Sequence, residues 1–148
     1  MLEVSFDELD ANDQALVRAA RAATQRAYAP YSKFKVGAAI RLQGGTVVEG
    51  ANQENAAYPS GTCAERTAAF YAHASFPDKP FETIAIAAVG TDGQPTEEPT
   101  APCCGCRQVL LEYEKLAGHP VRVILAGKER IYVLPSVKAL VPLAFTEF

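Results

Sequence analysis

The sequence predicts an α/β fold, namely a three-layer α/β/α sandwich with a mixed five-stranded sheet. Segments with apolar residues at helical spacing alternate with short runs of β-branched and small residues. Their order is α-β-β-α-β-α-β-β-α, which places a sheet between helices. The chain of 148 residues is 49% hydrophobic, which suits one core, so we expect residues 1–148 to form a single domain.

Turn and capping residues delimit the expected elements. Asp10 or Asn12 can cap the first helix, and Gly118 ends the third. Gly44 and Gly45 form the turn between the first two strands, which we interpret as a hairpin. The expected helices are residues 14–29, 63–75 and 103–117 with a short final helix after Ser136, and the expected strands are residues 34–42, 46–51, 81–90, 121–126 and 130–133.

The charge of the chain limits its partners. The net charge is −3, from 14 basic and 17 acidic residues, which argues against nucleic acid as a partner. The first ten residues carry acidic side chains and no basic one, unlike a secretory signal, and no apolar run is long enough to span a bilayer. We therefore expect a cytoplasmic protein without a membrane partner. In that compartment clustered cysteines bind metal or take part in chemistry more often than they form disulfides.

The cysteines form a pattern typical of a metal site. The sequence has only 2 histidines, so a three-histidine site cannot be built. Cys103 and Cys106 form a C-x-x-C pair at the start of a predicted helix, and Cys63 starts another, with Glu65 two residues later. A lone C-x-x-C pair also occurs in redox proteins, but redox use needs neither a third cysteine nor a nearby glutamate. Three thiolates with one open position are typical of catalytic zinc.

The remaining cysteine, Cys104, is expected not to bind the metal. Adjacent residues on a helix point about 100° apart, so Cys103 and Cys104 cannot easily bind the same ion as Cys106. We expect Cys104 to be a small packed side chain instead. The two helix N-termini and Arg66 would offset the negative charge of three thiolates, and Glu65 would transfer protons.

Three segments resemble the cytidine deaminase family, specifically its small homotetrameric type. They are PYSKFKVGAAI at residues 30–40, NQENAAYPSGTCAERTA at residues 52–68 and PCCGCRQVLLEY at residues 102–113. The resemblance implies a cytidine deaminase-like catalytic domain. It also implies hydrolytic deamination of cytidine and 2′-deoxycytidine to uridine and 2′-deoxyuridine with release of ammonia, as in pyrimidine salvage.

The resemblance implies roles for the residues around the metal. Cys63, Cys103 and Cys106 match the ligands of one Zn²⁺ per chain. Glu65 matches the catalytic proton shuttle, and Arg66 matches a donor of hydrogen bonds to a thiolate.

It also implies how a nucleoside binds. Asn52 and Glu54 match the residues that hold the ribose 3′-hydroxyl, and Phe34 matches the aromatic residue on the pyrimidine ring. The backbone of Ala64 is expected to accept a hydrogen bond from the base amino group. The homotetramer implied by the resemblance has shared active sites, to which a neighbouring subunit contributes Ala56, Tyr58 and Phe145.

Two other functions remain open at this point. One is deamination of another amine-bearing heterocycle, such as blasticidin S, guanine or a base within RNA. The other is a non-catalytic binding module stabilised by zinc. The pair Asn52 and Glu54 favours a free nucleoside, the acidic charge disfavours RNA, and a structural zinc site has no need of Glu65.

Overall fold

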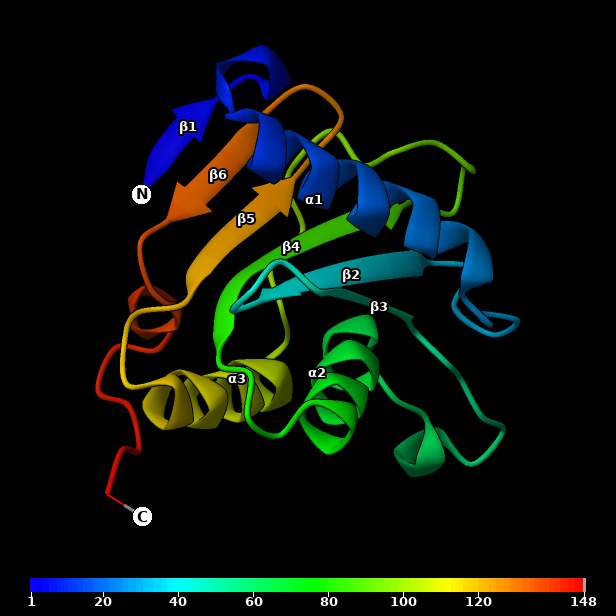
Figure 1. Ribbon diagram of the computed structural model, residues 1–148. Coiled ribbons are helices and arrows are strands. Elements are labelled where there is room, and N and C mark those ends of the chain that lie inside the picture. The colour runs from blue at the N-terminus through cyan, green and yellow to red at the C-terminus, as the bar shows by residue number, and fades with distance from the viewer. Residues whose placement is uncertain (148) are drawn as a thin grey trace.

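The computed structural model describes residues 1–147 and shows one mixed sheet between two layers of helices (Figure 1). The strand order is β1-β6-β5-β4-β2-β3, in which β4 and β5 are parallel and all other neighbours are antiparallel. The strands are β1 (Leu2–Val4), β2 (Lys35–Leu42), β3 (Val47–Ala51), β4 (Phe81–Val89), β5 (Arg122–Ala126) and β6 (Ile131–Leu134). The α-helices are α1 (Ala11–Ala23), α2 (Ala64–Ser75) and α3 (Cys104–Ala117), and short 3-10 helices cover Phe6–Glu8, Thr24–Arg26, Tyr58–Ser60 and Val137–Leu140.

The predicted three-layer sandwich is confirmed, but the expected number of five strands is one too low. The sixth strand is β1, which pairs antiparallel with β6 at the edge of the sheet, with Leu2 opposite Val133. A strand of 3 residues is too short for an alternating pattern to be recognised in the sequence. Its pairing partner also lies at the other end of the chain.

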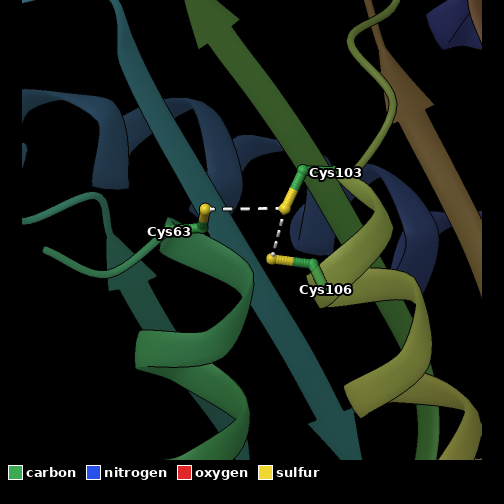
Figure 2. A group of neighbouring side chains, drawn as sticks. All are labelled: Cys63, Cys103 and Cys106. Atoms are coloured by element: carbon green, nitrogen blue, oxygen red, sulfur yellow. Dashed lines mark hydrogen bonds between the residues drawn. The ribbon is translucent and has the colours of Figure 1, made fainter. Parts of the chain in front are cut away.

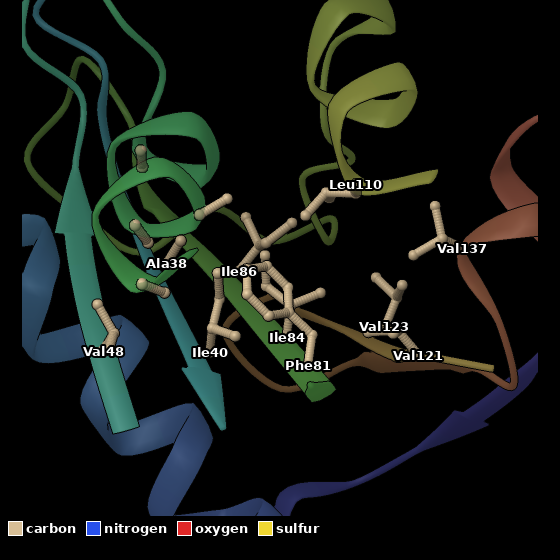
Figure 3. Close-up of a cluster of buried hydrophobic side chains, with 14 of the residues drawn as sticks. Ala38, Ile40, Val48, Phe81, Ile84, Ile86, Leu110, Val121, Val123 and Val137 are labelled. Carbon is tan, nitrogen blue, oxygen red and sulfur yellow. The ribbon is translucent and has the colours of Figure 1, made fainter. Parts of the chain in front are cut away.

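Both layers of helices are explained by the alternation of side chains along the central strands. In β4, Ile84 and Ile86 belong to the apolar cluster beneath α2 and α3 (Figure 3), whereas Ala85 and Ala87 belong to the cluster beneath α1. The first helix therefore packs on small side chains. The helices on the other face pack on large ones.

Two glycines allow helices to lie close to the sheet, one on each face. A Cβ atom at Gly37 would lie 2.1 Å from the carbonyl oxygen of Ala20 in α1. A Cβ atom at Gly50 would lie 2.6 Å from the backbone nitrogen of Ala68 in α2. Both distances are far below van der Waals contact, so these positions exclude any side chain. Gly50 thereby sets the position of α2 against β3.

The first helix is shorter than predicted. Asp10 is its N-cap and accepts a hydrogen bond from the backbone N–H of Asp13 over 2.8 Å, whereas Asn12 lies inside the helix. The α-helix ends at Ala23 rather than at residue 29, and the hydroxyl of Thr24 donates to the carbonyl of Arg21 over 2.7 Å. A hydroxyl that bonds back to the preceding turn competes with the regular helix pattern. Among residues 1–147, no helix is both long and apolar enough to cross a membrane.

Candidate functional site

Three cysteine side chains meet where the N-termini of α2 and α3 approach one another (Figure 2). Cys63 is the N-cap residue of α2 and Cys103 is the N-cap residue of α3, while Cys106 lies in the first turn of α3. Their sulfur atoms all lie within 4.8 Å of one another. We call these three residues the sulfur group. The free N–H groups of two helix ends point toward this region and favour negative charge there.

The spacing of the sulfur group fits zinc. The Sγ atoms of Cys63 and Cys103 are 3.8 Å apart, and those of Cys103 and Cys106 are 3.5 Å apart. A tetrahedral zinc ion with Zn–S bonds of about 2.3 Å separates its sulfur ligands by about 3.8 Å. Two of the three sulfur–sulfur distances are therefore already close to those of a zinc site.

The electrostatic surroundings favour the thiolate form at Cys63, and thiolates rather than thiols bind zinc. A hydrogen bond from the Cys106 thiol, assisted by one from Arg66, lowers the pKa of Cys63 to about 5, although burial opposes this. The guanidinium of Arg66 donates to the Cys63 sulfur over 3.5 Å. Cys106, which donates in this pair and is buried, has a raised pKa.

Glu65 is a buried carboxylate beside the sulfur group. Its side chain is on the first turn of α2, only 4% of the residue is exposed, and its Oε2 lies 3.8 Å from the Cys106 sulfur. Burial is the main cause that raises the pKa of Glu65. A carboxyl group with a raised pKa holds its proton more firmly than a free carboxyl group does, which suits a group that accepts and passes on protons.

Cys104 lies outside the sulfur group, among the residues that the structure describes. The prediction that Cys104 is a packed side chain is wrong, because Cys104 is exposed. Cys104 is the first residue of α3 and lies in the sequence between Cys103 and Cys106, whose side chains belong to the sulfur group.

An open groove of about 500 Å³ lies next to the sulfur group. Its wall includes Cys63 and Arg66 together with Asn52, Glu54 and Tyr58. The groove therefore brings the candidate metal site and the predicted ribose contacts Asn52 and Glu54 onto one surface, together with Tyr58, which the family resemblance assigns to a neighbouring subunit. Its remaining lining residues are Tyr31, Ser32, Gln53, Asn55, Gly61 and Thr62.

Comparison with known proteins identifies the family of this chain. A family model for the cytidine and deoxycytidylate deaminase zinc-binding region matches residues 10–117. The cytidine deaminase of Halalkalibacterium halodurans is 40% identical over 133 residues, which cover 90% of this chain and 93% of that protein. The chain belongs to the cytidine and deoxycytidylate deaminase family.

Solved structures of the deaminase family have the same architecture. The crystal structure of cytidine deaminase from Burkholderia pseudomallei has a TM-score of 0.76 at 42% identity and covers 88% of this chain and 97% of that chain. The cytidine deaminase from Mycobacterium tuberculosis has a TM-score of 0.68 at 31% identity, covering 93% and 100%. The zinc-binding region of the family model includes the whole sulfur group, so zinc is the cofactor of this deaminase.

In this deaminase, Asn52 and Glu54 are hydrogen-bonded to the segment before and at the start of β2. The Asn52 amide accepts from the Val36 backbone over 2.8 Å and donates to the Phe34 carbonyl over 2.9 Å. The Glu54 carboxylate accepts from the backbone of Tyr31 over 3.0 Å. These bonds join the two loops that form the groove.

The other predicted contact residues differ in burial and lie outside the groove lining. Phe34 is half-buried just before β2, and Ala64 is buried as the first residue of α2. Ala56 and Phe145 are exposed and are not among the residues that line the groove, and Phe145 belongs to the C-terminal tail. Phe34 and Ala64 are not among the lining residues either, so within one chain none of these four residues forms part of the groove wall.

Two groove residues, Tyr31 and Ser32, were not identified as functional from the sequence. Both lie in the PYSKFKVGAAI segment, so the signal was present in the motif. Their position opposite Glu54 depends on contacts between residues 22 and 23 positions apart. No local pattern reveals such a contact.

Proposed function

We propose that the protein is a zinc-dependent hydrolase that converts cytidine and 2′-deoxycytidine to uridine and 2′-deoxyuridine with release of ammonia. The observation that carries this proposal is the buried carboxylate of Glu65 beside the sulfur group and next to an open groove. A structural zinc site has no use for such a carboxylate. The relatives named cytidine deaminase support the substrate class. The reaction serves pyrimidine salvage in the cytoplasm, and residues 1–148 act as one catalytic domain.

The residues around the metal have distinct tasks. Cys63, Cys103 and Cys106 hold one Zn²⁺ per chain. When bound, zinc supplies the nucleophile at neutral pH by making a water molecule acidic. Removal of an exocyclic amine by hydrolysis needs a proton on ring nitrogen N3 and another on the departing nitrogen. Glu65 transfers both, because burial raises its pKa, while Arg66 offsets the charge of the thiolates.

The groove holds the nucleoside. Asn52 and Glu54 bind the ribose 3′-hydroxyl, Phe34 packs on the pyrimidine ring, and the Ala64 backbone accepts from the base amino group. A neighbouring subunit of a homotetramer completes the site. Support comes from the exposure of large aromatic side chains, 75% for Tyr58 and 65% for Phe145, since aromatic residues are enriched at interfaces. The residues that the neighbour contributes are Ala56, Tyr58 and Phe145.

The substrate class is tested with an absorbance assay on the purified protein. We expect about one zinc ion per chain and deamination of cytidine and deoxycytidine. We expect little activity on free cytosine, which lacks the ribose that Asn52 and Glu54 bind, and little on a cytidine-containing oligonucleotide. Activity confined to the oligonucleotide, or none on any of these substrates by the zinc-loaded protein, contradicts the proposal.

The ligand assignment is tested with a matched pair of cysteine variants. Cys106→Ser removes a buried sulfur of the group, so we expect loss of zinc and of turnover. Cys104→Ser makes the same chemical change on the exposed neighbour two positions away and should keep both. Zinc content is measured by atomic absorption. A full zinc content in Cys106→Ser contradicts the assignment.

A further inference from the structure

The carboxylate of Glu54 is held on the groove wall by three hydrogen bonds from two adjacent residues. The backbone N–H groups of Tyr31 and Ser32 donate to Oε1 over 3.0 and 3.1 Å, and the Ser32 hydroxyl donates to Oε2 over 2.5 Å. A carboxylate offers about four acceptor sites. About one site therefore remains for a hydroxyl group of a ligand in the groove.

The same Ser32 hydroxyl also contacts Phe34. Its oxygen accepts a hydrogen bond from the Phe34 backbone N–H over 3.1 Å, while the Phe34 carbonyl accepts from Asn52. Lys33, between them, has a φ of 58°, a left-handed conformation that is uncommon for residues other than glycine. Such a conformation persists only where neighbouring contacts hold it. The turn is therefore fixed by Ser32 on one side and by Asn52 on the other.

We infer that Ser32 is a positioning residue for substrate selection, whose hydroxyl fixes the Glu54 carboxylate relative to Phe34. This inference rests on the proposed function, in which Glu54 binds the ribose and Phe34 contacts the base. Through Ser32, the residues that bind the two halves of a nucleoside keep one relative placement. Ser32 contributes to the choice of substrate without binding it.

The same hydrogen bonds also affect the protonation of Glu54. Hydrogen bonds from Ser32, first from its side chain and then from its backbone, lower the pKa of Glu54. They therefore favour the ionised carboxylate, which is a strong acceptor for a ribose hydroxyl.

The test compares two substrates in the zinc-loaded protein. Ser32→Ala removes the hydroxyl but keeps the backbone N–H groups, so we expect kcat/KM for cytidine to fall about tenfold. For 3′-deoxycytidine, which has no 3′-hydroxyl for Glu54 to bind, we expect kcat/KM to change by less than about twofold. Ser32→Thr keeps a hydroxyl and should restore the preference. Ser75→Ala, the same change at the exposed C-terminal end of α2, is the control.

A second readout does not depend on turnover. The pKa of Glu54, followed by the carboxyl carbon shift in NMR, should rise in Ser32→Ala and stay unchanged in Ser75→Ala. An unchanged pKa, or an equal loss of activity on both substrates, overturns the role of Ser32. A wild-type protein that does not deaminate cytidine overturns the proposed function instead, and the pKa measurement then still decides whether Ser32 holds Glu54.

Discussion

Buried carboxylates lie on both faces of the sheet, and the surroundings of Asp13 on one face and Glu65 on the other differ. On the α1 face, Asp13 is 2% exposed and accepts from Arg41 over 3.1 Å and from Arg122 over 2.7 Å. On the α2 and α3 face, Glu65 is 4% exposed and lies beside the Cys106 thiol, with no ion pair to a guanidinium among the described residues. Two cations neutralise Asp13, whereas burial raises the pKa of Glu65.

The difference distinguishes a carboxylate that stabilises the fold from one that is suited to proton exchange. A buried charge whose acceptor sites are filled by cations ties elements together, and in Asp13 these elements are α1, β2 and β5. A buried carboxylate without such partners is less stable in its ionised form, so it is suited to exchanging protons. Glu114 on α3 also ties elements together, but through the neutral donors of Val121, Ser136 and Val137 rather than through cations.

The largest effect is expected from neutral substitutions of Glu65. Glu65→Ala or the isosteric Glu65→Gln removes the group that we propose transfers protons, so turnover of cytidine should fall roughly 10²–10⁴-fold. The zinc content should remain at the wild-type level. For Glu65→Gln the free energy of unfolding should change by less than about 1 kcal/mol, because the shape is conserved. Steady-state kinetics, metal analysis and urea unfolding measure these quantities.

The matched control for Glu65 is Glu129→Gln, which makes the same change on the exposed turn between β5 and β6. It should leave turnover unchanged. If Glu65→Gln keeps nearly full activity, the distinction between the two faces is wrong.

The second effect concerns the α1 face, where we expect a loss of stability and no loss of activity. Asp13→Asn removes the counter-charge of Arg122 and leaves Arg41 with only the more distant Glu82, at 3.7 Å, so the free energy of unfolding should fall by about 2–4 kcal/mol. Zinc content and turnover of the folded protein should stay within about twofold of wild type, because no described contact joins Asp13 to the site. Denaturant unfolding and the deamination assay on the same preparation check both statements.

Asp78→Asn, in the exposed turn before β4, provides the control for the loss of a carboxylate. It should leave the unfolding midpoint unchanged. An Asp13→Asn variant that loses zinc before it unfolds would show that the two faces are coupled, contrary to the comparison.

The sulfur group could be predicted from the sequence and the Asp13 network could not, for a physical reason. The C-x-x-C spacing at a helix start and the C-A-E segment are local patterns, and helix geometry alone relates their side chains. The partners of Asp13 are 28 and 109 residues away along the chain. Nothing in the composition near Asp13 indicates them, and they exist only once β2 and β5 pair on either side of β4.

The secondary structure shows the same difference between features set by local patterns and features set by long-range contacts. Helices and strands with clear periodicity, such as β4 and α3, were predicted within one or two residues of their observed ends. The first helix was predicted too long because Thr24 bonds back to the preceding turn. The edge strand β1 was missed because only its partner β6 defines it. Local sequence patterns therefore do not predict elements that depend on tertiary contacts.

The smallest effects, and the sharpest comparison of the two faces, come from two glycines in the hairpin. Gly37→Ala and Gly50→Ala are chemically identical changes in β2 and β3, and each forces a Cβ atom into the backbone of a helix. Both should lower the free energy of unfolding by roughly 1–3 kcal/mol. Gly37→Ala displaces α1, which carries no group of the site, so zinc affinity should remain as in wild type.

Gly50→Ala displaces α2, because its Cβ would lie 2.6 Å from the Ala68 nitrogen and 2.8 Å from the Ala64 carbonyl oxygen. Ala64 directly follows Cys63, so a shift of this first turn moves one sulfur of the group away from the two on α3. Zinc affinity, measured by competition with a chelator, should therefore fall about 10–100-fold in Gly50→Ala alone. Equal losses of zinc affinity in both variants would mean that the sheet transmits displacements of either helix to the sulfur group. The position of α2 would then not be set by Gly50 independently of the α1 face.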